Sequence, residues 1–367
     1  RNTMRKPKDQ QTKTYDGLKP NPPEARQRLD VHQAITDKIV AAIEAGAGTF
    51  EMPWHRPGVA FTIPKNAVTD KPYRGSNILS LWIDADQKKF EHQVFATYKQ
   101  WQELGAQVRG GEKGSLIVKY GEWVPKDKDD QGKRDAKPDA GGQDEDDGKR
   151  LYAKPAYVFN VDQVDVPVDV RASLLPATQP RPDLTERLDA VDRFVAAVGI
   201  EIREGGQRAF YRDSKGEGDF IQMPPRALFT GTTTSTPTEA YYSTLLHEEI
   251  HGSGAAHRLN RQFGERFGDK AYAFEELVAE LGAAFLCAHL EVTNTPRPDH
   301  AQYCASWVAA LKGDTKAIFS AASLATRAVD YLLALQPRHA PEPDGSEPVR
   351  PAIDDPAARS PSSRGPR

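Results

Sequence analysis

The chain has 367 residues, enough for two domains, and its hydrophobic content of 38% is low for a single compact globule, so we expect part of it to stay unburied. The net charge of −3 conceals an asymmetry: residues 1–125 carry 19 Lys and Arg against 14 Asp and Glu, and the remainder carries 30 against 38. A basic first part and an acidic second part favour different partners. Because no uninterrupted apolar run reaches about 18 residues, we expect no membrane span. The polar start and the two cysteines in apolar contexts favour a cytoplasmic protein, and we expect a monomer.

The start of the chain is expected to be flexible and to lead into an amphipathic helix. Residues 1–28 are polar and rich in proline. The stretch that follows has apolar side chains at helical spacing, at Val31, Ile35, Ile39 and Ile43. Residues 50–125 should mix short strands and helices. The segment 126–150 has dense mixed charge without apolar periodicity, so we expect a disordered insertion within a domain that resumes as a strand near 157.

We divide the chain into two domains of overall class α+β, a small mixed α/β domain and a mostly helical domain with a short sheet. The first covers 29–168 and the second 183–336, with a proline-rich linker at 169–182 and a disordered tail at 337–367. Periodicity in the second domain predicts a helix at 183–198, strands at 200–203, 208–211 and 219–223, and helices at about 237–252, 271–290, 299–312 and 315–335.

Residues 247–251 read H-E-E-I-H, on a predicted helix with a clear start. The sequence T-P-T-E at 236–239 is a capping box with proline in the first turn. His247 and His251 lie one turn apart on one helix face and can hold one metal ion. Glu248, beside them, can take a proton from a water molecule that the metal activates. The motif therefore predicts a metal centre with hydrolytic chemistry.

The third metal ligand has two kinds of candidate. His257 fits the spacing of metzincin peptidases, but that class needs a methionine turn after it and no methionine follows His257. Glu276 and Glu280 are four residues apart on a helix that is otherwise free of charge from 277 to 288, where an unpaired carboxylate would be costly. We therefore predict Glu276 as the ligand and Glu280 as the group that holds a ligand histidine from behind, with Glu280 and His257 as alternative ligands. Glu275 is explained by the dipole of the helix N-terminus.

The two carboxylates also match a known pattern. Glu276, Ala279 and Glu280 resemble the E-x-x-A-[DE] of gluzincin peptidases, which implies a zincin-like fold. By the same analogy, residues 219–224 correspond to the strand that lines the cleft and holds an extended substrate. Tyr303 and His300 are candidates to stabilise an oxyanion, although Tyr303 also fits a helix packing residue.

The first domain interleaves basic and aromatic side chains, an arrangement that single-stranded nucleic acid binding uses. The candidates are Tyr73, Arg74, Tyr98, Lys99, Trp101, Arg109 and Lys113. The loop V-R-G-G-E-K-G-S from 108 can present cations and bare glycine amides to phosphates, but it lacks the pattern of a P-loop. A small domain with aromatics in its core would look similar, and Trp82 and Trp101 fit that alternative.

Motifs along most of the chain resemble the ArdC family of plasmid antirestriction proteins. In the first half they are P-x-N-x-x-T-x-x-x-Y-R-G-x-N from Pro64, G-A-x-V-R-x-G-E-K-G from Gly105 and F-N-V-x-Q from Phe159. In the second half they are L-L-H-E-E-I-H, R-L-N-R from Arg258, E-E-L-V-A-E and S-W-V-A-A-L-K-G-D. The resemblance covers about 29 to 335 without the charged insertion. The first-half motifs also resemble the amino-terminal domain of some conjugative DNA primases.

The resemblance implies a single-stranded DNA-binding domain joined to a metallopeptidase-like domain that protects plasmid DNA entering a new bacterial cell. The expected cofactor is Zn²⁺, with Mn²⁺ or another divalent metal as alternatives. The expected partners are single-stranded DNA and, as peptidase substrate, a host restriction protein. The sequence departs from the usual motif at Glu249, where an apolar residue is typical, so proteolysis is less firmly implied than metal binding. The main alternative is a non-enzymatic DNA-binding protein with a structural or inactive metal site, and a general intracellular protease is a third.

Overall fold

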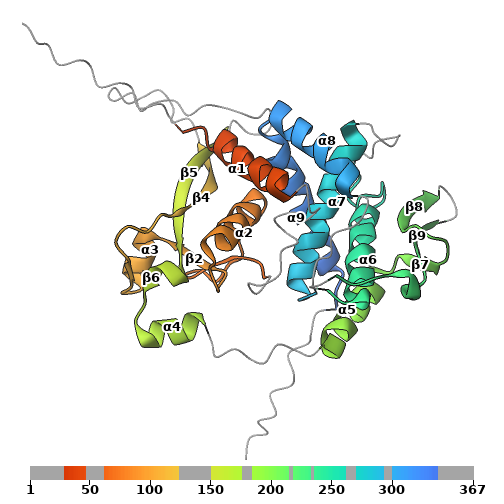
Figure 1. Ribbon diagram of the computed structural model, residues 1–367, viewed down its shortest axis with the longest axis horizontal. Helices are drawn as coiled ribbons and strands as arrows, with labels where there is room; N and C mark the ends of the chain where they lie inside the picture. Colours follow the sequence, from red (N-terminus) through yellow and green to blue (C-terminus); the bar gives the residue numbers. More distant parts are fainter. Residues whose placement is uncertain are drawn as a thin grey trace, which may run out of the picture.

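The computed structural model describes residues 29–46, 62–123, 150–175, 184–214, 218–232, 235–261, 270–292 and 300–337. The start that is predicted to be flexible, nearly all of the charged insertion and the tail beyond 337 lie outside these residues. The described chain has the α+β fold predicted from the sequence, with a small sheet-and-helix part followed by a mostly helical part (Figure 1).

The first part is built on a four-stranded sheet and a short two-stranded ladder. Its strands are β1 (Lys65–Asn66), β2 (Val94–Thr97), β3 (Gln107–Val108), β4 (Ser115–Trp123), β5 (Arg150–Asn160) and β6 (Val164–Asp165). The sheet has the order β1-β2-β5-β4, and β3 pairs with β6. β1 runs parallel to β2, whereas the other neighbours are antiparallel. Since the ladder of β4 and β5 reaches from Ser115 opposite Val158 to Trp123 opposite Arg150, these strands form a long hairpin.

Helices of the first part pack on both faces of this sheet and close its edge. They are α1 (Val31–Gly46), α2 (Ser76–Lys88), α3 (Tyr98–Glu103), the short 3-10 helix η1 (Val161–Gln163) and α4 (Val168–Leu174). β4 is an edge strand, and the Asn77 amide on α2 donates to the Val118 carbonyl at 2.9 Å and accepts from the Val118 amide at 2.8 Å. Ser80 donates to the carbonyl of Leu116 at 2.7 Å. These contacts satisfy backbone groups that an open edge would offer to another strand.

The second part is a bundle of helices with a small sheet beside it. Its elements are α5 (Leu184–Val198), β7 (Glu201–Glu204), β8 (Phe210–Ser214), β9 (Gly218–Met223), the 3-10 helix η2 (Arg226–Leu228), α6 (Pro237–Ser253), α7 (Lys270–His289), α8 (His300–Gly313) and α9 (Ala317–Ala334). The sheet has the order β7-β9-β8, with β9 parallel to β7 and antiparallel to β8. The strands and helices predicted for this part are confirmed to within a few residues.

The helices α6 and α7 approach each other closely, and this brings the two predicted metal-site motifs together. α7 is buried along almost all of its sides. At Gly282 an added Cβ would lie 2.8 Å from Cδ1 of Ile250 on α6. A side chain there would push the helices apart, because close-packed cores do not absorb such an overlap without shifting. Glycine at 282 therefore helps to set the distance across which histidines on α6 face carboxylates on α7.

One hydrophobic core joins the two parts of the chain. Buried residues of α1 and α2, among them Ile35, Ile39 and Leu79, belong to the same cluster as those of α6, α7 and α9. α1 packs against α8 and α2 against α9, although these helices are far apart in sequence (Figure 1). A hydrogen bond from Thr36 Oγ1 to the carbonyl of Thr315, 2.7 Å long, crosses the same boundary. The predicted domains are thus segments of chain that share a core.

The first half of the predicted linker is helical. α4 occupies Val168–Leu174, so the chain is helical where a linker at 169–182 was expected. The cause is local: the segment V-D-V-R-A-S-L after Pro167 has helix formers and an acidic residue in the first turn. Residues 176–182 lie outside the described part of the chain.

α9 is long and apolar enough to cross a membrane by length and composition alone. In the fold it is a core helix, because Ile318, Ala325 and Leu332 are buried in the shared cluster. Its exposed side carries Asp330, which pairs with Arg74. The packing accounts for its apolar composition without a membrane.

Candidate functional site

The helix that carries the histidines starts as the sequence predicts. Thr236 caps α6: its hydroxyl accepts from the Glu239 amide at 3.1 Å, and the Glu239 carboxylate accepts from the Thr236 amide at 2.9 Å. Pro237 begins the helix. Such a box satisfies backbone donors at the helix start. It fixes where α6 begins and therefore which of its faces meets α7.

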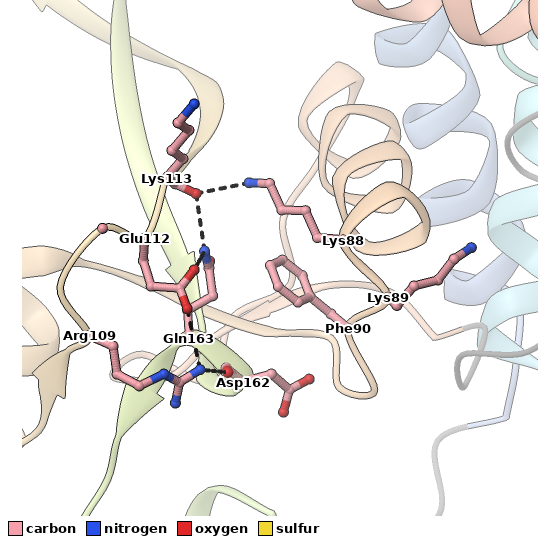
Figure 2. A pocket seen from close by; sticks show the side chains of 9 residues that line it. Lys88, Lys89, Phe90, Arg109, Glu112, Lys113, Asp162 and Gln163 are labelled. Atoms are coloured by element: carbon pink, nitrogen blue, oxygen red, sulfur yellow. Dashed lines mark hydrogen bonds and ion pairs between the residues drawn. The ribbon is translucent and has the colours of Figure 1, made fainter.

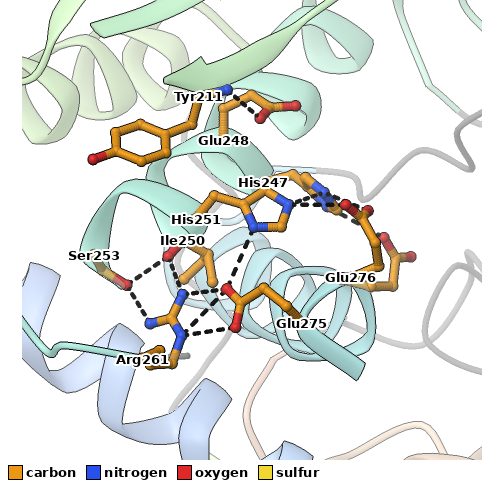
Figure 3. Close-up of polar contacts among 10 residues, drawn as sticks. Tyr211, His247, Glu248, Ile250, His251, Ser253, Arg261, Glu275 and Glu276 are labelled. Carbon is orange, nitrogen blue, oxygen red and sulfur yellow. Dashed lines mark hydrogen bonds and ion pairs between the residues drawn. The ribbon is translucent and has the colours of Figure 1, made fainter. Parts of the chain in front are cut away.

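His247, His251 and Glu276 converge across the α6–α7 interface (Figure 3). The two Nε2 atoms of the histidines lie 3.1 Å apart. One oxygen of Glu276 is 3.5 Å from Nε2 of His247, and the other is 3.5 Å from Nε2 of His251. All three side chains are buried or nearly so. The structure therefore brings together the ligand set predicted from the spacing of the two motifs.

This spacing fits a divalent metal. Tetrahedral Zn²⁺ with nitrogen and oxygen ligands at about 2.1 Å has its ligand atoms about 3.4 Å apart. The two Nε2 atoms lie 3.1 Å apart and each is 3.5 Å from one oxygen of Glu276, so each of these pairs is close to that value. With one ligand atom taken from each residue, the three atoms lie within 4.8 Å of one another. Two neutral imidazoles and a carboxylate are also a donor set that Zn²⁺ and other first-row divalent ions accept.

Each histidine is backed by a carboxylate at its other ring nitrogen. Oε2 of Glu280 lies 3.6 Å from Nδ1 of His247, which places Glu280 where the sequence predicts it. Oε1 of Glu275 lies 3.4 Å from Nδ1 of His251. A carboxylate within hydrogen-bond distance of Nδ1, as Glu275 is for His251, keeps the proton there and leaves the Nε2 lone pair free for a metal.

Glu275 is the functional residue that sequence reasoning missed. The sequence pattern attributes it to the helix dipole, yet Arg261 holds it inside the site, with Nη2 donating to Oε1 at 2.7 Å. Arg261 also donates to Ser253 Oγ at 2.8 Å and to the carbonyl of Ile250 at 2.6 Å (Figure 3). One sequence signal could have predicted this contact: the chain has an arginine-containing segment, R-L-N-R, followed by two adjacent glutamates, and a buried arginine needs a buried acid as its partner.

The carboxylates set the charge of the cluster. Burial lowers the pKa of His251, but Glu276 and Glu275 outweigh burial and raise it to about 10. Burial opposes ionisation of Glu276, yet His251 and His247 hold the pKa of Glu276 far below its usual range. A metal that binds Nε2 of His251 must displace a proton, so metal binding at this site is coupled to pH.

Glu248 lies on α6 beside the ligands, but its carboxylate also contacts the small sheet. Oε2 of Glu248 accepts from the backbone amide of Tyr211 on β8 at 3.0 Å (Figure 3). The prediction places the cleft strand at residues 219–224, but the strand that contacts Glu248 is β8. β9 holds those residues in the middle of the sheet, paired on both sides, and cannot add a peptide strand. β8 is the edge strand nearest to Glu248 and is available for strand addition.

Glu249, the departure from the usual motif, is fully buried and points away from the metal cluster. No described residue donates a hydrogen bond to either of its carboxylate oxygens. Burial raises the pKa of Glu249 to about 8; Arg258 nearby opposes this shift. Arg258 itself pairs with Asp219 on β9 and donates to the carbonyl of Gly252 at 2.9 Å.

The remaining candidates in this part lie outside the cluster or outside the described side chains. His257 has a half-exposed side chain, and its Nε2 is 4.0 Å from Asp219 rather than near the ligands. The structure thus separates His257 from the group of possible ligands. Tyr303 and His300 lie in the first turn of α8, and their side chains are not among those described, so their roles stay predictions.

Three of the predicted DNA-binding residues have structural roles. Trp101 is fully buried, and its indole donates to the carbonyl of Phe159 at 3.0 Å, so it is a core residue and cannot stack on a base, in agreement with the alternative interpretation of its sequence. Arg74 pairs with Asp330 on α9. Tyr73 is half-buried and packs its ring edge-on against Phe95. The basic and aromatic pattern around 73–77 therefore serves packing between the two parts of the chain.

The other four lie on the surface of the first part. Tyr98 and Lys99 are exposed at the start of α3, and Arg109 and Lys113 bracket the glycine-rich loop before β4. Arg109 lies 3.4 Å from Glu112, and no described carboxylate pairs with the Lys113 ammonium. The loop separates two surface hollows, one of which is shown in Figure 2.

Comparison with known proteins gives matches over both parts. A model of the N-terminal domain of anti-restriction factor ArdC matches residues 29–159, and a model of zincin-like metallopeptidases matches residues 189–324. The crystal structure of antirestriction protein ArdC from the R388 plasmid in its metal-free form is 36% identical, with a TM-score of 0.63, over 84% of this chain and 98% of that one. Its Mn(II)-bound form is 35% identical, with a TM-score of 0.64, over 85% and 100%.

Two curated relatives are also similar. Protein y4eC of Sinorhizobium fredii is 44% identical over 84% of this chain and 92% of its own length. DNA primase TraC of Escherichia coli is 32% identical over 89% of this chain, which spans 29% of the primase.

Proposed function

Because the chain belongs to the ArdC family of antirestriction proteins, we propose that it protects plasmid DNA entering a bacterial cell, by binding single-stranded DNA through its first part and hydrolysing peptide bonds at the metal centre of its second. The proposal places its action in the cytoplasm of the recipient cell and gives the peptidase a host restriction protein as substrate. The observation that carries the hydrolytic part is the convergence of His247, His251 and Glu276 beside Glu248.

In hydrolysis, some of these residues would hold the metal and another would transfer protons. His247, His251 and Glu276 would hold the metal, which when bound supplies a Lewis acid that polarises a peptide carbonyl and activates water. Glu248 is buried beside them, and its carboxylate can accept a proton and later pass it to the leaving amine. The edge strand β8 would align an extended peptide along the site, because β9 pairs with only one of its sides; on the other side the Tyr211 amide donates to Glu248.

We propose Zn²⁺ as the native metal, on the grounds of the donor set and its spacing. The Mn(II)-bound R388 protein makes Mn²⁺ the competing choice. Metal analysis of protein purified without added metal would decide between the two. Displacement of Zn²⁺ by Mn²⁺ at equal concentration would contradict the choice of zinc, since the usual order of affinities favours zinc.

A second candidate function is DNA protection without proteolysis. One observation favours it: the carboxylate of Glu248 accepts a hydrogen bond from the Tyr211 amide, which draws it toward the sheet. A base held in this way is a poorer proton acceptor, since a hydrogen bond to a carboxylate stabilises its ionised form. In this case the metal cluster would have a structural role only.

The test compares Glu248→Gln with wild type and with Glu204→Gln, a control at an exposed glutamate on β7. Conjugative transfer is measured into restricting and non-restricting recipients. If proteolysis protects the DNA, Glu248→Gln loses the advantage in restricting recipients while Glu204→Gln keeps it. Full protection by Glu248→Gln with metal bound would rule out proteolysis as the mechanism and leave the binding function standing.

A further inference from the structure

Two surface hollows lie on either side of the glycine-rich loop at 109–113, each with a volume of about 450 Å³. We name them by their aromatic residue. The Tyr98 hollow lies between Tyr98, Phe159 and Arg109. The Phe90 hollow lies beside Phe90, where the Lys88 ammonium donates to the backbone carbonyl of Lys113 at 2.9 Å (Figure 2). Both volumes are in the range of small-ligand sites, and Arg109 lines both.

The hollows differ in charge. Four cations and two carboxylates line the Phe90 hollow. One cation, Arg109, and two carboxylates, Glu112 and Asp165, line the Tyr98 hollow. The first therefore attracts an anionic group such as a phosphate, whereas the second does not. An occupant of the Tyr98 hollow should be uncharged.

The hollows also differ in their aromatic surface. Phe90 is 6% exposed, so its ring offers no free face. Tyr98 is 44% exposed and stands edge-on to Phe159, with the ring centres 6.3 Å apart. The amide of Gln107 reaches the same hollow and donates to the Tyr98 hydroxyl at 3.2 Å. Aromatic faces beside an amide and an arginine are the surroundings that proteins use to bind an unpaired nucleobase.

The aromatic surface continues along β5. Tyr157 is 52% exposed and lies two residues before Phe159, so the two side chains are on the same face of the strand. Packing at the base of this surface is close at Gly114, where an added Cβ would lie 3.1 Å from the Cβ of Tyr157. The row Tyr157, Phe159 and Tyr98 thus runs from the open face of the hairpin into the Tyr98 hollow.

We propose that this row is the base-binding track for single-stranded DNA: the Tyr98 hollow receives one unpaired base, Tyr157 stacks on a neighbouring base, and the Phe90 hollow takes a backbone phosphate. Arg109 lies between the hollows and contacts the bound DNA strand from both of them. The inference rests on the proposed binding of single-stranded DNA and adds its location. It excludes duplex DNA as the preferred ligand, because a paired base would have to leave its stack to enter the hollow.

The test uses the full-length chain and a short fluorescent oligothymidine, with affinity read from anisotropy at several salt concentrations. Tyr98→Ala and Tyr157→Ala should each weaken binding by between about fivefold and a hundredfold, the usual range for losing one base stack. Tyr157→Phe should bind like wild type. Tyr120→Ala is the matched control, because Tyr120 is 53% exposed on the same hairpin but lies near His32 at the other end. This control should keep its affinity.

Phosphate binding at the Phe90 hollow has a separate readout. Lys113→Gln should lower the slope of log affinity against log salt by about 0.7, the value for one phosphate contact on a single strand. Lys71→Gln, at an exposed lysine outside the loop, should leave the slope unchanged.

The outcomes separate the location from the function. If wild type does not bind the oligonucleotide, the proposed binding function fails and the track fails with it. If wild type binds but Tyr98→Ala and Tyr157→Ala bind equally well, the function stands and the location is wrong. A loss with Tyr120→Ala equal to that with Tyr157→Ala, or equal affinity for a duplex of the same length, would also overturn the track.

Discussion

Arg261 and Glu275 form a buried ion pair directly behind the metal cluster: Nη2 of Arg261 donates to Oε1 of Glu275 at 2.7 Å, and both side chains are 5% exposed. The same oxygen of Glu275 lies 3.4 Å from Nδ1 of His251. The pair ties the loop after α6 to α7 and orients a ligand histidine. The pair positions these groups and adds little to the free energy of unfolding, since a buried ion pair rarely stabilises a protein much more than apolar packing does.

We expect Glu275→Gln to weaken metal binding by about 10- to 100-fold, because an amide cannot stabilise the Nδ1 proton of His251 as a carboxylate does. Titration calorimetry with Zn²⁺ and Mn²⁺, at a temperature where circular dichroism shows a folded protein, measures the change. Glu204→Gln, at an exposed carboxylate on β7, serves as the control. Unchanged affinity in Glu275→Gln would show that Glu275 only holds the loop.

The identity of the third ligand gives a sharper contrast. Glu276→Ala should abolish binding of one metal ion per chain, because both of its oxygens lie 3.5 Å from the ligand nitrogens. His257→Ala should leave binding intact, because His257 faces Asp219 and not the cluster. Metal content after dialysis, measured by plasma mass spectrometry, distinguishes the two variants. The reverse pattern would assign the third ligand to His257.

Glu249 should make stability depend on pH. Burial raises its pKa from the usual 4.5 to about 8, so between these values the folded protein keeps a proton that the unfolded chain releases. Stability must therefore fall as pH rises through this window, by about 1.4 kcal/mol per pH unit from this group. Glutamine does not titrate, so Glu249→Gln should gain stability relative to wild type from pH 5 to pH 8.

Thermal unfolding of both proteins in the presence of a chelator measures this difference. The chelator removes the contribution of metal binding, and the comparison cancels titration of the other groups. Parallel pH profiles for the two proteins would mean that Glu249 is ionised in the folded state and has a partner.

The metal site could be predicted from sequence because its ligands have fixed spacings on two helices. His247 and His251 share a helix face at any register, and Glu280 stood out as a charge in an apolar helix. Glu275 and Arg261 were missed because their contact depends on how the loop after α6 folds back, and no periodicity encodes that. The prediction that residues 219–224 form the cleft strand was wrong for a similar reason. They lie on β9 in the middle of its sheet, and strand order is a tertiary property.

The candidate DNA-binding residues show the same limit of prediction from sequence. The alternation of rings and cations marks the right region, but the sequence cannot separate a ring with a free face from one in the core. Trp101 and Tyr98 lie three residues apart on α3, and only Tyr98 is exposed. Burial is decided by β5 and β3, which pack on one side of that short helix.

The contact between Arg74 and Asp330 bears on whether the two parts unfold together. Nη1 of Arg74 lies 3.2 Å from Oδ1 of Asp330, but both side chains are about half exposed. Such a pair contributes at most about 1 kcal/mol. We therefore expect Arg74→Ala to lower the free energy of unfolding by less than that and to leave DNA affinity within about twofold. A large loss of DNA affinity in Arg74→Ala would return Arg74 to the binding surface.

The shared core should make the two parts unfold in one transition. Ile39 on α1 is fully buried in the cluster that also contains α7 and α9. Ile39→Ala should cost about 2–5 kcal/mol, the usual range for such a core truncation. Since the core is common, the loss should lower the melting temperature of the α6–α9 bundle as well as that of the β4–β5 sheet. Calorimetry should show a single peak that shifts as a whole. Two separate peaks, of which Ile39→Ala moves only one, would mean that the parts fold as independent domains despite their contact.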